Sequence, residues 1–350
     1  MRFAFSDDQL LFRDTVRDFL TKEVTPDDVR AAWVDRPADD DGRLPEVWAG
    51  LAEMGVIGLT VPEAQGGLGM HELDLVLLLE ETGRVALPEP IVETTAVVAP
   101  LLASLGSTPA RNQAQAWLTE IASGALVATT ALAGGGLVPH AEVAGLLVFE
   151  DGGSLKAIPG DDLAVTAEPS VDASRRLFSI ETCPSGEVVL AEGDEAAALL
   201  TVAFDHGALG TAAQLVGLAD HLLQTTVEYV KQREQFGVPI GSFQAIKHHL
   251  ADSLLALEFA RPVVYRAAYS MAHGLPTASR DVSMAKCYAS DAARLVVRHA
   301  LQCHGAIGYT VEYDLHLWMK RVWALAASWG DAAHHRARVA DAVLGPRLVT

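Results

Sequence analysis

The segment VKQREQFGVPIGSFQ, residues 230–244, ends one long helical pattern and leads through a turn into the next. A second segment, LQCHGAIGYTVEYDLHLWMKR at 301–321, joins a glutamine to a glycine-rich bend and then returns to helical spacing. Together they offer a guanidinium, amide side chains and accessible backbone, carried by Arg233, Gln235, Gln244, Gln302 and Gly305. Arginine has fixed paired donors and glycine lets the main chain approach, which suits a pyrophosphate. The two segments therefore predict a site for a diphosphate group.

Helical periodicity surrounds both segments. Apolar residues recur at helical spacing over five ranges, which are 208–234, 244–273, 277–303, 312–327 and 331–344. Gly and Pro residues interrupt the pattern at 237–239, 274–276 and 305–308, as expected at helix ends. Five long helices with short connections predict a helical bundle at 199–350.

The preceding part of the chain divides in two. Residues 1–122 have helical patterns, beginning with a capping box in which Ser6 is followed by Gln9. Residues 123–198 contain short β-prone runs such as ALVATTALA and AGLLVFE, separated by Gly, Pro and Asp. We therefore predict a mainly α protein in three parts: an N-terminal helical domain, a small middle β domain and the C-terminal bundle.

Composition limits the possible partners and locations. The net charge of -19 argues against binding nucleic acid or an anionic membrane, since both reward Lys and Arg. Three widely spaced cysteines match no disulfide or metal pattern, which suggests a reducing compartment. The start MRFAFSDDQLLF lacks the features of a secretory signal, and no run of 18 uncharged apolar residues occurs. We expect a cytoplasmic protein.

The two segments together resemble the acyl-CoA dehydrogenase family of flavoproteins. Five residues fall on matching positions, while Gln235 replaces a common Thr and Ala306 a Gly; the five are Arg233, Phe236, Gln244, Gln302 and Gly305. The stretch WAGLAEMGVIGLTVPEAQGGLGM at 48–70 is similar to the N-terminal helical domain of the same family. The resemblance implies the predicted domain order and a grip on the FAD diphosphate and adenosine of a neighbouring subunit, made by the five residues and Gln235.

Each of these residues also has a simpler interpretation. Arg233 could merely complement a helix dipole, Phe236 could be a core residue, and Gly305 could only permit a tight turn. We favour FAD contact because all of them occur together at the family spacing. The same resemblance implies removal of a proton and a hydride from an acyl-CoA thioester, which requires a carboxylate base.

That base is missing from both places where the family carries it. Counting forward from Glu312 puts Trp329 at the position of the usual glutamate, and an indole cannot accept the proton. Counting back from Arg233 puts Gly207 at the second known position. Asp331 and Asp205 lie two residues from these positions, so either could substitute only if the backbone shifted.

The flavin-ring loop of the family is also missing. The β region has no Trp between Trp117 and Trp318 and is short for the family. The run from Asp172 to Arg176 resembles an Asp-x-Ser-Arg-Arg motif of shortened members, although an exposed β-turn explains it equally well. Histidine pairs at 248–249 and 334–335 lack acidic or thiol partners at ligand spacing, so we predict no metal site.

One hypothesis joins a preserved diphosphate grip to a missing base. The chain resembles the non-catalytic subunit of heteromeric actinobacterial steroid-CoA dehydrogenases, which are α2β2 assemblies. The resemblance implies an acyl-CoA substrate from fatty acid or steroid oxidation and an electron-transfer flavoprotein as acceptor. Two alternatives stay open: an autonomous homo-oligomeric enzyme with an Asp base, and a structural or CoA-binding protein without flavin.

Overall fold

The described chain is mainly helical with a small amount of sheet, as predicted. A computed structural model describes residues 4–33, 42–106, 110–132, 136–182 and 186–345. The chain forms two compact units, one of residues 1–78 and 88–210 and the other of residues 79–87 and 211–350. The boundaries expected near residues 122 and 198 stay a prediction.

Helices make up the first part of the chain. Their bounds are α1 Asp7–Glu23, α2 Pro26–Ala31, α3 Pro45–Glu53, α4 Glu72–Arg84, α5 Ala99–Ala103 and α6 Arg111–Ala122, with a π-helix at Val92–Val98. Helix α1 begins with the predicted capping box, because the Ser6 hydroxyl accepts from the Gln9 N–H and the Gln9 side chain accepts from the Ser6 N–H. In the turn before α4, a Cβ on Gly67 would lie 2.1 Å from the Val61 carbonyl oxygen. Only glycine fits there.

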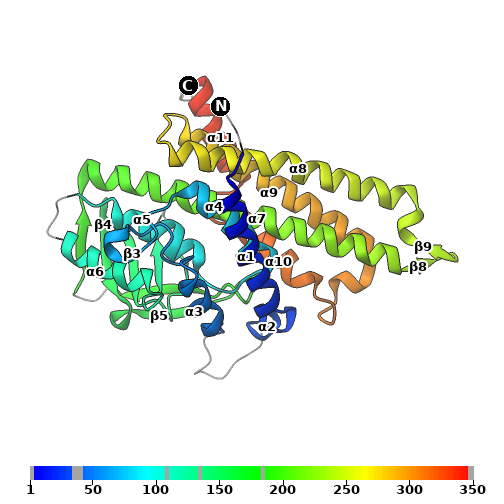
Figure 1. Ribbon diagram of the computed structural model, residues 1–350, viewed down its shortest axis with the longest axis horizontal. Coiled ribbons are helices and arrows are strands. Elements are labelled where there is room, and N and C mark those ends of the chain that lie inside the picture. The colour runs from blue at the N-terminus through cyan, green and yellow to red at the C-terminus, as the bar shows by residue number, and fades with distance from the viewer. Residues whose placement is uncertain (1–3, 34–41, 107–109, 133–135, 183–185, 346–350) are drawn as a thin grey trace. The chain divides into compact units, whose positions relative to one another are not determined.

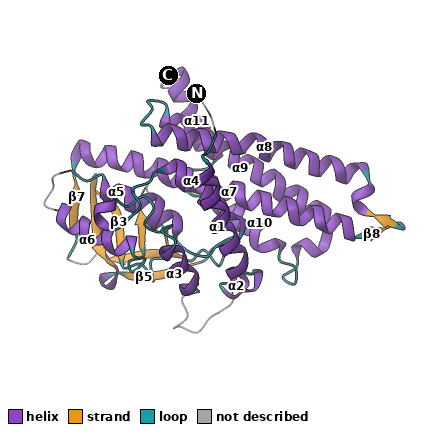
Figure 2. Ribbon diagram, viewed as in Figure 1, coloured by secondary structure: helices purple, strands orange, loops and turns teal. Residues whose placement is uncertain are grey.

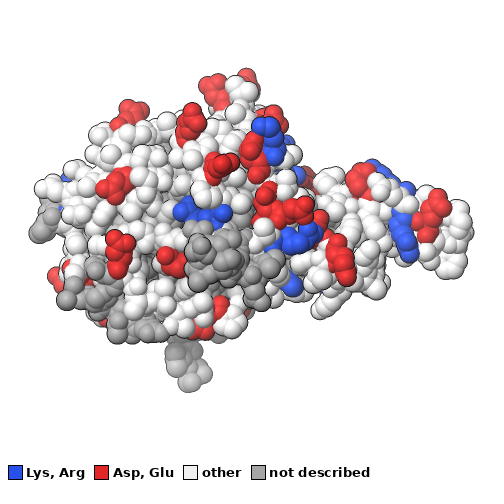
Figure 3. Space-filling view, turned by 90° about the horizontal axis from the view of Figure 1, so that it is seen from below, with Lys and Arg blue, Asp and Glu red and all other residues white. Residues whose placement is uncertain are grey.

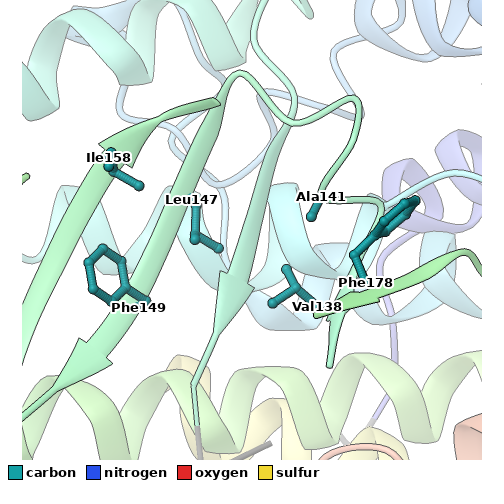
Figure 4. Packing of buried hydrophobic residues seen from close by; sticks show 6 residues of the cluster. All are labelled: Val138, Ala141, Leu147, Phe149, Ile158 and Phe178. Carbon is teal, nitrogen blue, oxygen red and sulfur yellow. The ribbon is translucent and has the colours of Figure 1, made fainter. Parts of the chain in front are cut away.

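The β region consists of two small sheets. One has the order β1-β3-β4-β7 and the other β2-β6-β5. The strands are β1 Ala128–Ala131, β2 Val138–Pro139, β3 Leu146–Asp151, β4 Ser154–Pro159, β5 Ala164–Glu168, β6 Leu177–Thr182 and β7 Val188–Ala191. A shared core of buried side chains joins the two sheets (Figure 4), made by Val138, Ala141, Leu147, Phe149, Ile158 and Phe178. The predicted β region is therefore present as a packed element with its own core.

Helix α7 runs from Gly193 to Gln232 and begins 15 residues before the predicted start at 208. Its first turn carries Asp194 and Glu195, which stabilise the positive end of the helix dipole. The helix is long and apolar enough to cross a membrane by composition, but 61% of its apolar window is buried inside the protein. This burial is what a core helix of a folded domain shows.

The second unit is the predicted bundle (Figures 1 and 2). It contains the carboxyl-terminal part of α7, then α8 Gln244–Ala272, α9 Ala278–His304, α10 Leu315–Ala327 and α11 Ala332–Leu344. Helices α8 and α9 form an antiparallel pair, and the rings of His249 and His299 lie 4.5 Å apart across it. This contact places the start of α8 beside the end of α9.

A buried carboxylate ties the end of α4 to the bundle. Glu80 is 5% exposed and accepts from Arg261 Nε at 3.1 Å and from the Tyr265 hydroxyl at 2.6 Å. Burial raises the pKa of Glu80, and the charge of Arg261 offsets this only in part. Trp318 Nε1 also donates to the Arg84 carbonyl at 2.8 Å. Residues 79–87 are thus an integral part of the second unit.

Acidic and basic side chains are mixed over the face that Figure 3 shows, with apolar and neutral residues between them. Many of the described cations have carboxylate partners, such as Lys231 with Glu228 at 2.6 Å and Lys156 with Glu187 at 2.7 Å. Pairing of this kind is common on a protein surface and contributes little stability by itself.

Candidate functional site

Arg233 begins a short β-hairpin that directly follows α7. Its N–H still bonds to the Tyr229 carbonyl at 2.9 Å, as in a helix, while its carbonyl accepts from the Ile240 N–H at 2.8 Å. Strands β8 Glu234–Gln235 and β9 Val238–Pro239 pair between these bonds. The hairpin turn consists of Phe236 and Gly237, both with positive φ, which is the geometry of a tight two-residue hairpin. The sequence predicted only a turn here.

Phe236 lies at the tip of this hairpin and is 93% exposed. Its only described ring neighbour is Phe243, whose centroid is 6.2 Å away in an edge-on arrangement. The interpretation of Phe236 as a core residue is therefore wrong for this chain. A large apolar side chain this exposed is typical of a contact surface when other apolar residues surround it.

Gln244 is the first residue of α8 and is exposed. The N-cap residue before it, Phe243, makes no side-chain capping bond. The positive end of the dipole of a 29-residue helix therefore faces the surface beside the hairpin. This arrangement favours an anion at the start of α8.

Gly305 ends α9 in a conformation that requires glycine. Its φ of 66° and ψ of −142° lie in a region that other residues avoid, and a Cβ built there would meet nothing within 4 Å. The position therefore opens onto free space, while Gly308 is tight, with Leu315 Cδ2 and His304 Cβ both 3.0 Å from such a Cβ. The turn interpretation holds for both glycines, and the open space at Gly305 leaves room for a ligand.

The fold brings all six predicted residues to one end of the second unit. The Tyr229 ring stacks on the His304 ring at 4.1 Å, which holds the end of α7 against the end of α9. The antiparallel α8–α9 pair places the start of α8 at the same end. All six are exposed there: Arg233, Gln235, Phe236, Gln244, Gln302 and Gly305. Figure 1 shows β8 and β9 projecting at this end, which we call the bundle end.

The bundle end offers donors to an anion. Among the residues that the structure describes, Arg233 has no carboxylate within ion-pair distance, unlike Lys231 two residues earlier. Several apolar side chains surround the donors and are exposed by at least 37%, namely Phe236, Val238, Phe243, Ile307, Tyr309 and Val311. An arginine without a carboxylate partner, surrounded by exposed apolar side chains, is typical of a surface that another molecule covers.

The turn that joins α10 to α11 has an unusual backbone. Trp329 has a φ of 55° and Gly330 a φ of 83°. His335, which is fully buried, lies with its Nε2 2.8 Å from the Trp329 carbonyl oxygen, and the Nζ of buried Lys286 donates to the Gly330 carbonyl at 3.0 Å. Burial lowers the pKa of His335 to about 4, so the ring is neutral near pH 7. These two side chains fix the turn.

Comparison with known proteins identifies the family. Its N-terminal domain model matches residues 6–125 and its C-terminal domain model residues 197–344. The acyl-CoA dehydrogenase IpdE2 of Mycolicibacterium smegmatis is 33% identical over 326 residues, covering 93% of this chain and 95% of that protein. The chain belongs to the acyl-CoA dehydrogenase family. The family predicted from sequence is confirmed, and its members are FAD-dependent oxidoreductases.

Solved structures of acyl-CoA dehydrogenases share the fold. The ChsE4–ChsE5 complex of Mycobacterium tuberculosis has a chain with a TM-score of 0.85 and 23% identity, covering 99% of this chain and 100% of its own. A steroid acyl-CoA dehydrogenase variant, Tcur3481–Tcur3483, has a TM-score of 0.84 and 25% identity, with 97% and 98% coverage. The resemblance to steroid-type members agrees with these neighbours.

The bundle end fits the diphosphate part of FAD, the cofactor of this family. The chemistry of its donors is that of an anion site: one guanidinium, three amides and a helix amino terminus with no side-chain cap. The open space at Gly305 lets backbone approach the ligand. Contact of the six residues with FAD stays a prediction.

The two aspartates considered as substitute bases are poorly suited to that role in an acyl-CoA dehydrogenase. Asp331 caps α11 by accepting from the His334 N–H at 2.8 Å, and this bond lowers the pKa of Asp331, so the carboxylate is a weaker base. Asp205 is 3% exposed, so its carboxylate is not accessible from the surface.

Next to Asp205, the buried His206 bonds to Glu72 at 2.7 Å through Nε2. Burial raises the pKa of Glu72, but the bond and charge of His206 outweigh it, so the net pKa is lowered.

The Asp172 motif is not an exposed turn. Asp172 is fully buried, and its Oδ1 accepts from the Ser174 hydroxyl at 2.6 Å and from the Ser174 N–H at 3.2 Å. Arg175 lies 3.7 Å from the buried Glu93. The motif is therefore a structural element of the β unit. Among the described residues, no group of three or more His, Cys, Asp or Glu could hold a metal ion.

Sequence reasoning missed the groups beneath the site. Tyr229 and His304 support the bundle end, whereas Lys286 supports the Trp329 turn, and each acts through a neighbour that is distant in sequence. The available signal was an aromatic residue one helical turn before Arg233, combined with a histidine directly before Gly305.

Proposed function

We propose that this chain is the non-catalytic subunit of a heteromeric FAD-dependent acyl-CoA dehydrogenase and completes the FAD site of its partner. The partner would carry the catalytic glutamate and a full flavin-binding β domain. The assembly would remove a proton and a hydride from an acyl-CoA of fatty acid or steroid oxidation. FAD, when bound, accepts the hydride.

One observation carries the proposal: the diphosphate donors are gathered and exposed at the bundle end, while the base position holds an indole. A self-sufficient enzyme would carry both the diphosphate donors and a catalytic base. Arg233, Gln244 and Gln302 would bind the diphosphate and adenosine of a flavin seated on the partner. Phe236 at the hairpin tip would pack against the partner and exclude water from these charged hydrogen bonds, which strengthens them.

Trp329 supports the same division of labour. Lys286 and His335 fix the main chain of this turn. The indole side chain of Trp329, however, cannot accept the proton that leaves the α-carbon of an acyl-CoA. The alternative enzyme with an Asp base is weakened by the capping role of Asp331 and the burial of Asp205. Replacing each aspartate by asparagine in the purified chain tests that alternative, because activity must then disappear while FAD stays bound.

The decisive experiment compares the chain alone with the chain co-expressed with a full-length acyl-CoA dehydrogenase encoded beside it. We expect a colourless, inactive single chain and a yellow, active complex. A yellow and active single chain would refute the proposal. A complex that assembles but stays colourless would also refute the proposal. It would favour the third possibility, a structural or CoA-binding protein.

A variant tests the contact itself. In the complex, Arg233→Ala removes a charge-assisted hydrogen bond, which should weaken FAD binding roughly 10- to 100-fold. Arg111→Ala is the matched control, since Arg111 is an exposed arginine on α6. Equal FAD affinity in the two variants would contradict the assignment of Arg233.

Three further points belong to the proposal. We infer an α2β2 assembly in the cytoplasm, with an electron-transfer flavoprotein as the electron acceptor. The family resemblance supports the acceptor, and the buried free thiols of Cys287 and Cys303 are compatible with a reducing compartment. We also retain three domains at 1–122, 123–198 and 199–350 as the functional division.

A further inference from the structure

The side chains beneath the bundle end form a compact aromatic group. His304 is the last residue of α9 and is 5% exposed. Its ring stacks on Tyr229 of α7 at 4.1 Å with an interplanar angle of 24°. On its other side the ring of Tyr313 lies 5.1 Å away. Three separate chain segments therefore meet at one imidazole.

The hydrogen bonds of His304 select one form of the ring. Its Nδ1 lies 2.8 Å from the Ala300 carbonyl oxygen, which can only accept, so Nδ1 carries a proton. Burial lowers the pKa of His304, so the ring is neutral near pH 7 and its Nε2 is an acceptor. The Tyr313 hydroxyl lies 3.3 Å from Nε2 and can donate to it. The ring is thus held in a single orientation.

Two residues next to this aromatic group, Gly305 and Arg233, belong to the predicted diphosphate grip. Gly305 follows His304 directly, and Arg233 follows Tyr229 by one helical turn, with its N–H bonded to the Tyr229 carbonyl. The Tyr229–His304 stack therefore links the segment that carries the guanidinium to the bend that carries the open backbone. A diphosphate needs both sets of donors at a fixed separation, since errors near 1 Å weaken such contacts.

We propose that Tyr229, His304 and Tyr313 are positioning residues that set the spacing between Arg233 and the Gly305 bend for the FAD diphosphate. This inference rests on the proposed function. None of the three has to touch the cofactor. Their role is to pre-organise the two halves of the site, which lowers the cost of ordering it when FAD binds.

The test measures the FAD dissociation constant of the co-expressed complex by titrating flavin into the apo-complex. Tyr229→Leu removes the stacked ring and should raise the constant about two- to tenfold. Tyr229→Phe keeps the ring and should restore wild-type affinity. Tyr313→Phe removes only the hydroxyl, so it should assemble normally and give a smaller rise.

His221→Leu is the matched control, because it breaks another stacked ring contact of the bundle, the one with Trp318, and no residue of the predicted grip is positioned by that contact. Melting temperatures are measured beside the affinities. The inference holds if Tyr229→Leu weakens FAD binding while His221→Leu, at a similar loss of melting temperature, does not. Equal affinities in these two variants overturn it, and so does a Tyr229→Phe variant as weak as Tyr229→Leu.

The Arg233→Ala variant separates this inference from the proposed function. If Arg233→Ala weakens FAD binding and both Tyr229→Leu and Tyr313→Phe do not, the proposed function stands and the positioning role falls. If Arg233→Ala leaves the affinity unchanged, both fall together.

Discussion

The stability of the bundle should decrease in acid because of His221. This histidine stacks on Trp318 with ring centroids 4.1 Å apart and an interplanar angle of 7°. Burial lowers its pKa from 6.5 to about 4, with the positive charge of Arg84 adding to the effect. Well above pH 6.5 the ring is neutral in the folded and the unfolded chain, so it has no pH-dependent effect on stability there.

Below pH 6.5 the His221 ring binds a proton in the unfolded chain but stays neutral in the folded chain until the pH approaches 4. At pH 5 the unfolded ring is mostly protonated and the folded ring mostly neutral, which costs about 2 kcal/mol relative to pH 8. Replacing His221 by Phe keeps an aromatic ring on Trp318 but removes the titration. The difference in the free energy of unfolding between pH 8 and pH 5 should therefore shrink by about 2 kcal/mol.

Urea unfolding followed by tryptophan fluorescence at the two pH values measures this difference. Thr226→Val is a suitable control, because Thr226 is buried in the same helix and does not titrate. That variant should change the free energy of unfolding by the same amount at both pH values. If His221→Phe retains the full wild-type difference, the assignment of the acid sensitivity to this ring is wrong.

Three further substitutions test the packing and backbone arguments. Gly305→Ala forces a Cβ into a glycine-only conformation and should cost about 1–3 kcal/mol, seen as a lower melting temperature; no change would show that the bend relaxes freely. Glu80→Ala leaves Arg261 and Tyr265 without their buried acceptor and should cost about 1–3 kcal/mol in urea unfolding, whereas a neutral result would contradict the role of this carboxylate. Leu147→Ala opens a cavity in the β core, should cost about 2–5 kcal/mol and should speed proteolysis of that region; unchanged digestion would count against the core assignment.

The helices were largely predictable because the apolar period of 3.6 residues is a local signal. The predicted range 244–273 became α8 Gln244–Ala272, and 277–303 became α9 Ala278–His304. The start of α7 was placed at 208 rather than Gly193, because residues 196–200 form a continuous apolar run, AAALL, which has no helical period. The parallel pairing of β1 with β3 could not be predicted either, since strand order depends on contacts between distant segments.

The candidate site was predictable in its residues but not in its support. Arg233 and Gln302 were found because their residue types and spacing match a known pattern. The stack of His304 on Tyr229 depends on how two helices pack, which no local pattern encodes. Lys286 is the clearest case, because a lysine is expected on the surface and this one is fully buried.

The anchored turn between α10 and α11 has a consequence for which side chains residue 329 can carry. Its main chain is secured by Lys286 and His335, and neither anchor depends on which side chain residue 329 carries. The side chain at residue 329 can therefore be exchanged for one of different chemistry while the main chain of the turn stays in place.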